Sequence, residues 1–211
     1  MKTLLDLENW NRKEHFLHFS KMEEPFFGAT VEIDCTNAYQ TAKSLNASFF
    51  NYYLHKTLVA VNSIENFKYR ISKDQIYIND RIDASATIGR QDGTFGFSLI
   101  EYHPDFKIFE QNASTEIERI QNTTGLFTRS FDDNNLIHFS AIPWLNFTSL
   151  SHARSYTFPD SCPKISFGKM ITLDNGKKTM AMSVHVHHGL MDGLHVGQFV
   201  DLFQELMNLS K

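Results

Sequence analysis

The stretch from residue 175 to residue 206 constrains the fold more than any other part of the chain, because it encodes a turn, a strand and a helix in succession. Asn175-Gly176 is a strong two-residue hairpin signal. In the residues that follow, Lys178–His187, apolar side chains recur at a period of two, which predicts a strand. A helix is then predicted from apolar residues at helical spacing, namely Val196, Phe199, Val200, Phe203 and Leu206.

His188 follows this strand in line with its apolar row. That row consists of Val186, Val184, Met182 and Met180, and the other face carries His187, His185, Ser183 and Ala181. A histidine in such a row is expected to be partly dehydrated, which favours the neutral imidazole at pH 7. Neutral imidazole is the form that accepts a proton from a hydroxyl group, so His188 is a candidate general base. The alternative is a core histidine whose polar atoms are satisfied by its neighbours.

The residues after His188 bear on that choice. Asp192-Gly193 follows in a predicted turn, where the carboxylate could cap the helix. If Asp192 is buried it needs a cation, and spacing alone does not say which one. A zinc site is a weaker interpretation of the histidine cluster: there is no His-Glu-x-x-His pattern, and His187 and His188 face opposite sides of the strand. We therefore expect no metal.

Composition excludes several classes of protein. The 211 residues are 42% apolar, with 19 Phe and 7 Tyr, so a single domain over residues 1–211 has a large aromatic core available. The net charge is −4 and no Lys/Arg run exceeds two residues, which argues against nucleic-acid binding. We find neither a stretch apolar enough to cross a membrane nor a signal peptide, so we expect a cytoplasmic protein whose Cys35 and Cys162 are buried thiols. No Gly-x-Ser-x-Gly turn, Walker loop or dinucleotide-binding fingerprint is present.

The remaining patterns predict alternating strands and helices. Helices are expected at residues 48–62 and 105–121. Strands are expected at residues 30–34, 67–71, 75–78, 84–88, 94–100, 136–141 and 164–172. Strands joined mostly by hairpins, with helices between them, favour an α+β two-layer sandwich with a mainly antiparallel sheet.

Three sequence blocks resemble the chloramphenicol acetyltransferase family. The first is Trp10-Asn-Arg12-Lys-Glu-His-Phe16, the second is Ser140-Ala-Ile-Pro143-Trp144, and the third is His187-His188-Gly-Leu-Met-Asp192-Gly193. They stand in the order and spacing of that family and span nearly the whole chain. Catalytic domains of dihydrolipoyl acyltransferases share the third block, but the first favours the chloramphenicol branch. With Met1 only nine residues before Trp10, we expect no lipoyl or linker segment.

The resemblance implies a role for each matching residue. His188 corresponds to the general base that takes the proton of the acceptor hydroxyl as this attacks acetyl-CoA. Ser140 corresponds to the hydroxyl that stabilises the oxyanion. Asp192 and Arg12 correspond to a structural ion pair that holds the loop after the base. Ser166 stands where the family often has a threonine near the reacting centre.

The resemblance also implies binding residues and an assembly. Phe19, Phe27 and Phe95 align with aromatic side chains of the chloramphenicol pocket, and Trp144 aligns with a wall of the coenzyme channel. The family forms homotrimers with active sites between subunits and needs no metal.

The leading hypothesis is therefore direct transfer of acetyl from acetyl-CoA to chloramphenicol. The acidic Glu23-Glu24 stretch keeps open a different small hydroxylated acceptor. A catalytically silent binding relative is the third hypothesis, and the retained site residues argue against it.

Overall fold

The structure is a computed structural model that describes residues 1–131, 135–154 and 160–209. Its helices are α1 (Lys13–Phe19), α2 (Thr36–Ser44), α3 (Phe49–Ser63), the short 3₁₀ helix η1 (Glu65–Lys68), α4 (Phe106–Gln121) and α5 (Gly193–Asn208). Its strands are β1 (Lys2–Leu4), β2 (Phe26–Asp34), β3 (Tyr69–Ser72), β4 (Gln75–Asn79), β5 (Asp83–Gly89), β6 (Phe95–Phe97), β7 (Leu136–Ala141), β8 (Lys164–Phe167), β9 (Ile171–Thr172) and β10 (Lys178–His187).

The strands form two sheets. The larger one has seven strands in the order β2-β10-β8-β7-β5-β6, with β9 also paired to β10. Strand β7 runs parallel to both of its neighbours, β5 and β8, and the other pairs are antiparallel. The smaller sheet has the order β1-β4-β3.

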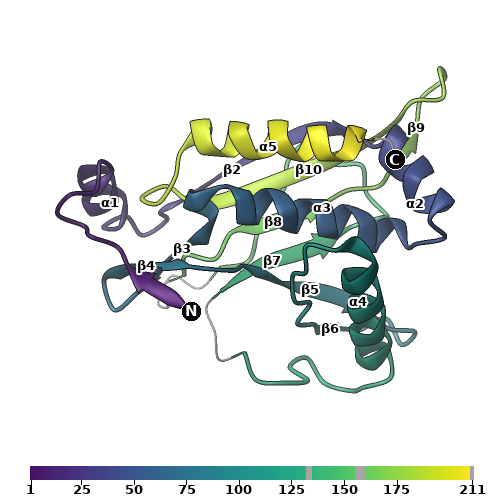
Figure 1. Cartoon of the computed structure of the whole chain (residues 1–211), viewed down its shortest axis with the longest axis horizontal. Helices are drawn as coiled ribbons and strands as arrows, with labels where there is room; N and C mark the ends of the chain where they lie inside the picture. Colours follow the sequence, from purple (N-terminus) through teal and green to yellow (C-terminus); the bar gives the residue numbers. More distant parts are fainter. Residues whose placement is uncertain (132–134, 155–159, 210–211) are drawn as a thin grey trace.

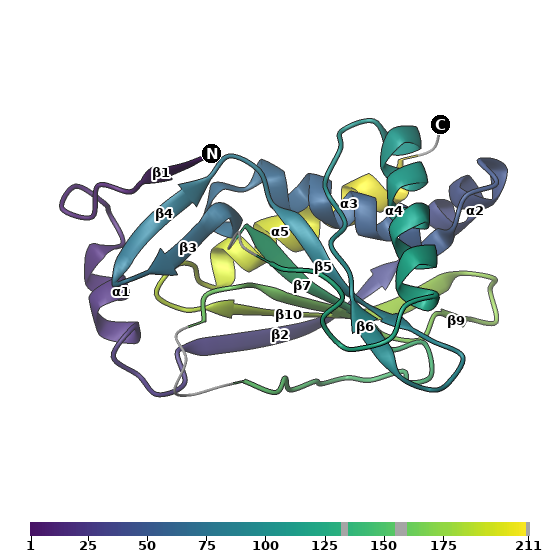
Figure 2. The same cartoon turned by 90° about the horizontal axis from the view of Figure 1, so that it is seen from below.

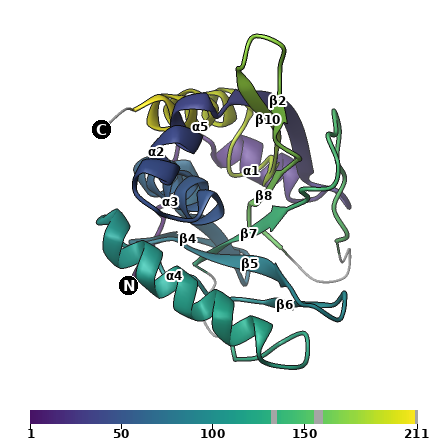
Figure 3. The same cartoon turned by 90° about the vertical axis from the view of Figure 1, so that its right-hand side faces the viewer.

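Helices cover one face of the larger sheet. Viewed end-on, α2, α3, α4 and α5 lie on one side of it, and the chain that follows β7 runs along the other side (Figure 3). The apolar row of β10 lies in the core beneath these helices, where Val184, Val186 and Met182 are buried against α3 and α5 residues such as Leu58 and Phe203. This arrangement confirms the predicted α+β sandwich with a mainly antiparallel sheet.

The two ends of the sheet carry different elements. Helix α1 lies beside the turn that joins β10 to α5, whereas β6 and α4 lie toward the opposite end (Figures 1 and 2). Both cysteines are free and buried, as predicted.

Some element boundaries differ from the predictions. The predicted 164–172 strand is broken after Phe167, because the Lys169 N–H donates to the Leu145 carbonyl at 2.7 Å, outside the sheet. The parallel β5–β7 and β7–β8 pairs were not anticipated, since we expected mostly hairpins. Helices α1 and α2 and strand β1 were missed: these short elements lack a clear apolar period.

Strand β2 begins four residues earlier than predicted, and Gly28 explains why the local pattern is weak there. Gly28 pairs with His185 of β10, whose ring lies across the glycine. A Cβ atom on Gly28 would be 2.3 Å from His185 Nε2, so any larger residue would force this ring to move. A glycine that allows such a close approach interrupts the alternation on which strand prediction depends.

Candidate functional site

His188 lies at the turn between β10 and α5, with its imidazole between two phenylalanines. The Phe19 ring stacks on it with ring centres 3.9 Å apart, and Phe27 contacts it at 4.6 Å. The His188 N–H donates to the Pro25 carbonyl at 2.7 Å, which joins the turn to the start of β2. His188 is half-buried, and its Nδ1 atom is buried without a hydrogen-bond partner among the described residues. We call His188, Phe19, Phe27, Arg12 and Asp192 the imidazole half-site.

Arg12 joins α1 to this turn. Its Nη1 atom donates to Asp192 Oδ2 at 2.6 Å and its Nη2 atom donates to the His188 carbonyl at 3.2 Å. The Arg12 side chain is only 9% exposed, whereas that of Asp192 is 33% exposed. The structure thus brings together the residues at the two ends of the chain, and the buried guanidinium receives its counter-charge from Asp192.

Asp192 also caps α5. Its side chain accepts a hydrogen bond from the Leu194 N–H at 3.0 Å, and its own N–H donates to His195 Nδ1 at 3.2 Å. Burial alone would raise the pKa of Asp192, but the hydrogen bond and the charge of Arg12 outweigh it and hold that pKa below its ordinary value. The carboxylate is therefore ionised near neutral pH, as the ion pair with Arg12 requires, and its charge is favourable at the N-terminus of α5.

Ser140 lies in a different part of the sheet. It occupies β7 opposite Ser166 of β8, and its Oγ accepts a hydrogen bond from Thr87 Oγ1 at 3.3 Å. Ser166 is 1% exposed, and its Oγ makes no hydrogen bond within the described part of the chain. We call Thr87, Ser140 and Ser166 the hydroxyl half-site.

A cavity of about 470 Å³ opens over the hydroxyl half-site. One wall is aromatic and consists of Phe95, Phe97, Phe127 and Phe131. The remaining lining includes Ser140 and Thr87 with the polar side chains of His138, His152 and Lys164. A cavity of this size with apolar walls and a few polar groups suits a small organic ligand.

The two half-sites are far apart within one chain. Ser140 aligns with Ser166, and Ser166 aligns with Ser183 on β10, which places Ser140 two strands away from Ser183. His188 lies five residues beyond Ser183, so from strand geometry the Cα atoms of Ser140 and His188 are roughly 19 Å apart. At that distance the two side chains do not reach the same reacting atoms within a single copy of the chain.

The other predicted site residues are divided between these places. Phe95 lines the cavity, whereas Phe19 and Phe27 lie on His188, so one chain does not assemble the three aromatics in one pocket. Trp144 is 78% exposed in the turn after β7, and its proposed contact with the coenzyme stays a prediction.

Sequence reasoning missed several cavity residues. Phe97 shares a strand face with Phe95, so the alternation in β6 could have identified it. Phe127 and Phe131 lie in a segment without periodicity, and no local signal identifies them. Thr87 was assigned to a strand but not recognised as the partner of Ser140.

Other histidines occupy structural positions around the strand. His187 Nδ1 accepts from the Gly189 N–H at 3.1 Å, and burial, followed by the charge of Arg154, lowers the pKa of His187 to about 4. Within residues 1–131, 135–154 and 160–209, no group of three or more His, Cys, Asp or Glu side chains is placed to hold a metal ion. In the same ranges, no helix has the length and apolarity needed to cross a membrane.

Comparisons with known proteins identify the family. The family model described as chloramphenicol acetyltransferase matches residues 1–204. The chain belongs to the chloramphenicol acetyltransferase family. It is 30% identical over 210 residues to chloramphenicol acetyltransferase 3 of Escherichia coli, covering 98% of this chain and 97% of the relative. It is 28% identical over 205 residues to a chloramphenicol acetyltransferase of Clostridium perfringens, covering 96% and 93%.

Solved structures agree with this assignment. A chloramphenicol acetyltransferase structure superposes with a TM-score of 0.91 at 33% identity, covering 99% of this chain and all of the other. A probable dihydrolipoamide acetyltransferase from Listeria monocytogenes shares the fold with a TM-score of 0.67 at 14% identity, covering 92% and 88%. The resemblance inferred from the three blocks is therefore confirmed, and with it the class of acetyl-CoA-dependent acyltransferases.

Proposed function

We propose that this protein is an O-acetyltransferase that moves the acetyl group of acetyl-CoA directly to a hydroxyl of chloramphenicol. The observation that carries the proposal is the setting of His188. Its imidazole stacks on Phe19 and makes a tilted contact with Phe27, at a turn held by a buried arginine, so the ring is oriented before any substrate binds. Preorganisation of this kind is what a proton-transferring group needs.

In the proposed reaction His188 removes the proton of the acceptor hydroxyl as its oxygen attacks the thioester carbonyl. A new C–O bond forms, and the tetrahedral intermediate carries a negative charge on the former carbonyl oxygen. The Ser140 hydroxyl donates a hydrogen bond to that oxygen. Collapse of the intermediate breaks the C–S bond, and the proton held by His188 passes to the leaving thiolate. Neither an acyl-enzyme nor a metal ion takes part.

We further propose that the active protein is a homotrimer in which each site combines the imidazole half-site of one subunit with the hydroxyl half-site of its neighbour. The separation of roughly 19 Å between Ser140 and His188 in one chain supports this arrangement. Large side chains exposed near the cavity, Phe127 at 69% and Phe95 at 46%, are available for such a contact.

A second acceptor class is favoured by the polar part of the cavity. His138 and Lys164 line the cavity together with the aromatic wall, so a ring-bearing alcohol with polar substituents other than those of chloramphenicol also fits this lining. The acidic stretch before β2 contributes less to this argument: the Glu24 carboxylate accepts from the Phe26 N–H at 3.0 Å and pairs with Arg154, which satisfies it internally.

The experiment is a thiol-release assay with acetyl-CoA and either chloramphenicol or a panel of small alcohols. We expect release with chloramphenicol, near-complete loss of turnover in His188→Ala, and normal turnover in His15→Ala, which removes an exposed histidine of α1. Release with another alcohol but not with chloramphenicol would reassign the acceptor. Ligand binding without release on any alcohol would support a catalytically silent protein instead.

A further inference from the structure

The aromatic wall of the cavity depends on a segment with no secondary structure of its own over most of its length. Residues 122–131, which we call the wall segment, follow α4 and bring Phe127 and Phe131 to the cavity. Phe127 contacts Phe97 with ring centres 5.3 Å apart, yet 69% of it remains exposed. Within one chain, ring contacts that leave so much of the Phe127 side chain exposed hold it only weakly, and polar contacts elsewhere in the wall segment add to them.

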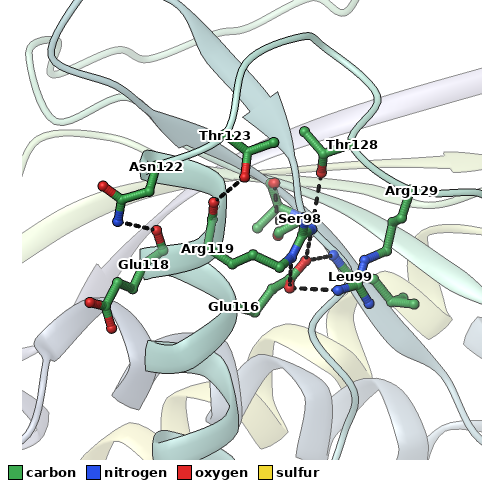
Figure 4. A network of polar contacts seen from close by, with 10 residues as sticks. Ser98, Leu99, Glu116, Glu118, Arg119, Asn122, Thr123, Thr128 and Arg129 are labelled. Atoms are coloured by element: carbon green, nitrogen blue, oxygen red, sulfur yellow. Dashed lines mark hydrogen bonds and ion pairs between the residues drawn. The ribbon is translucent and has the colours of Figure 1, made fainter.

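A buried carboxylate on α4 provides this hold (Figure 4). Glu116 Oε2 accepts from Arg129 Nη2 of the wall segment at 2.8 Å and from Arg119 Nε at 2.7 Å. Arg119 Nη2 also donates to Thr128 Oγ1 at 3.0 Å, so both arginines contact the wall segment or belong to it. Glu116 Oε1 accepts from the Leu99 N–H at 3.0 Å, which connects the same carboxylate to the chain after β6.

The charges explain why Glu116 is tolerated in the interior. Glu116 is 7% exposed, and a buried carboxylate is costly unless its hydrogen-bonding capacity is satisfied. Burial alone would raise the pKa of Glu116, but hydrogen bonds from Arg119 and the Leu99 amide and the charge of Arg129 hold that pKa below its ordinary value. The carboxylate is therefore ionised and joins three elements: α4, the chain beyond β6 and the wall segment.

A second anchor operates without Glu116. Arg90 Nη2 donates to the Gly125 carbonyl at 2.8 Å, and Arg90 Nε donates to the Ile120 carbonyl at 2.9 Å. The Phe97 N–H donates to the Leu126 carbonyl at 3.0 Å. These bonds hold the first half of the wall segment, whereas Arg129 and Thr128 hold the second half, which lies between Phe127 and Phe131.

We propose that Glu116, acting through Arg129, is a positioning residue that sets the aromatic wall of the acceptor cavity. The inference rests on the proposed function and deepens it. Because neither Glu116 nor Arg129 touches Ser140, loosening their contact moves the wall and leaves the reacting groups in place. Binding of the acceptor ring should weaken, while transfer of the acetyl group from bound substrates should continue.

The test compares Arg129→Met with Arg129→Lys and with Lys177→Met. Arg129 is 38% exposed, and its loss leaves Glu116 paired with Arg119, so the variant should fold. Lys177 is 43% exposed and pairs with Asp34 at 3.4 Å away from the cavity, which makes Lys177→Met a matched control. Glu116→Gln, which removes the charge from the other side, serves as a second variant.

We expect the KM for chloramphenicol, the acceptor used in the assay, to rise about 3- to 10-fold in Arg129→Met and Glu116→Gln, with kcat and the KM for acetyl-CoA within about twofold of wild type. Arg129→Lys should recover part of the acceptor KM, and Lys177→Met should match wild type. Amide hydrogen exchange in residues 95–99 and 122–131 should be faster in Arg129→Met, with no substrate present.

The experiment distinguishes failure of the proposed function from failure of the positioning role. If the wild-type protein transfers acetyl to no acceptor, the proposed function is rejected and this inference with it. If the wild-type protein is active but Arg129→Met leaves the acceptor KM unchanged, or lowers kcat while the acceptor KM stays constant, the proposed function stands and the positioning role is rejected. Unchanged amide exchange in both segments would likewise reject the role of Glu116 as an anchor.

Discussion

The ion pair between Arg12 and Asp192 predicts an asymmetry between two substitutions. Asp192→Asn retains the N-cap of α5, because asparagine caps helices about as well as aspartate, but it leaves the buried Arg12 guanidinium without a counter-charge. Breaking a fully buried pair from one side costs about 3–5 kcal/mol, and since one third of the Asp192 side chain is exposed we expect about 2–3 kcal/mol. Arg12→Met leaves a carboxylate at a helix N-terminus, where the helix dipole favours it, so we expect about 1 kcal/mol.

The two variants should rank in the opposite order for catalysis. Arg12→Met also removes the hydrogen bond to the His188 carbonyl, which Asp192→Asn retains, so turnover should fall further in Arg12→Met. Stability is measured by urea unfolding at one fixed protomer concentration, because the proposed trimer would make unfolding depend on concentration. Turnover is measured by thiol release.

A double-mutant cycle isolates the pair. Once Arg12 is absent, Asp192→Asn strands no charge, so the double variant should cost at least about 1 kcal/mol less than the sum of the single variants. Glu8→Gln, which breaks an exposed pair with Lys13 at 2.6 Å, should cost less than about 1 kcal/mol and serves as the control. Additivity within about 0.5 kcal/mol would refute the reasoning, because it would mean that the charges of Arg12 and Asp192 do not interact.

Three further predictions follow from single sites. Ser140→Ala should lower kcat by about 10²- to 10³-fold, because the variant lacks the hydroxyl that stabilises the oxyanion. Its melting temperature should not change, because that hydroxyl makes one long hydrogen bond in the fold, at 3.3 Å. A decrease in kcat of less than about tenfold in steady-state assays would rule out the oxyanion role of Ser140. The pKa of His187 is lowered to about 4, so between about pH 6 and pH 4 the unfolded chain binds a proton at this residue that the folded chain does not. The free energy of unfolding therefore decreases as the pH falls through this range. In urea titrations at several pH values, His187→Gln should reduce the slope of the unfolding free energy against pH by up to about 1.4 kcal/mol per pH unit. Gly28→Ala should destabilise the protein by about 1–3 kcal/mol because its Cβ would overlap the His185 ring, whereas Gly89→Ala, which meets nothing within 4 Å, should not; equal melting temperatures for the two would contradict this account.

The sequence was most informative where local pattern and packing agree. The apolar row of β10 was predicted from a period of two, and its members Val184 and Val186 are 1% and 0% exposed. Helix α3 was predicted within one residue at each end because Ser48, its N-cap, precedes a long apolar run. The pattern was absent in the first four residues of β2, where Gly28 accommodates a ring from β10, a contact that exists only after folding.

The candidate site was harder to predict, because its residues meet through tertiary structure. Spacing placed Asp192 at a helix start but could not show that Arg12, 180 residues away, would be its cation; that pairing came from the family resemblance. Glu116 reads as one of several charges on an amphipathic helix, and nothing in its neighbourhood reveals that two arginines and the Leu99 amide converge on it. The wall segment has no period at all, so its aromatics carry no signal before the chain folds.

The separation of the two half-sites leads to a last prediction about assembly. We propose that each site takes His188 from one subunit and Ser140 from the next. The His188→Ala variant then lacks the imidazole that a subunit contributes to one interface, and the Ser140→Ala variant lacks the hydroxyl that a subunit contributes to the other. In a ring of three, any mixed trimer contains one interface at which an intact His188 meets an intact Ser140. Random co-assembly of equal amounts should therefore restore about a quarter of wild-type turnover, since about three quarters of the trimers are mixed and each has one active site of three.

The measurement is thiol release by the co-expressed pair, with each variant alone and their mixture without subunit exchange as controls. A site contained within one chain would have both residues on the same copy, so co-assembly would restore nothing. A pair of variants from the same half-site, His188→Ala with Arg12→Met, should also fail to complement beyond the residual activity of Arg12→Met. Recovery in the first pair only would show that the chemistry takes place between subunits, as we propose.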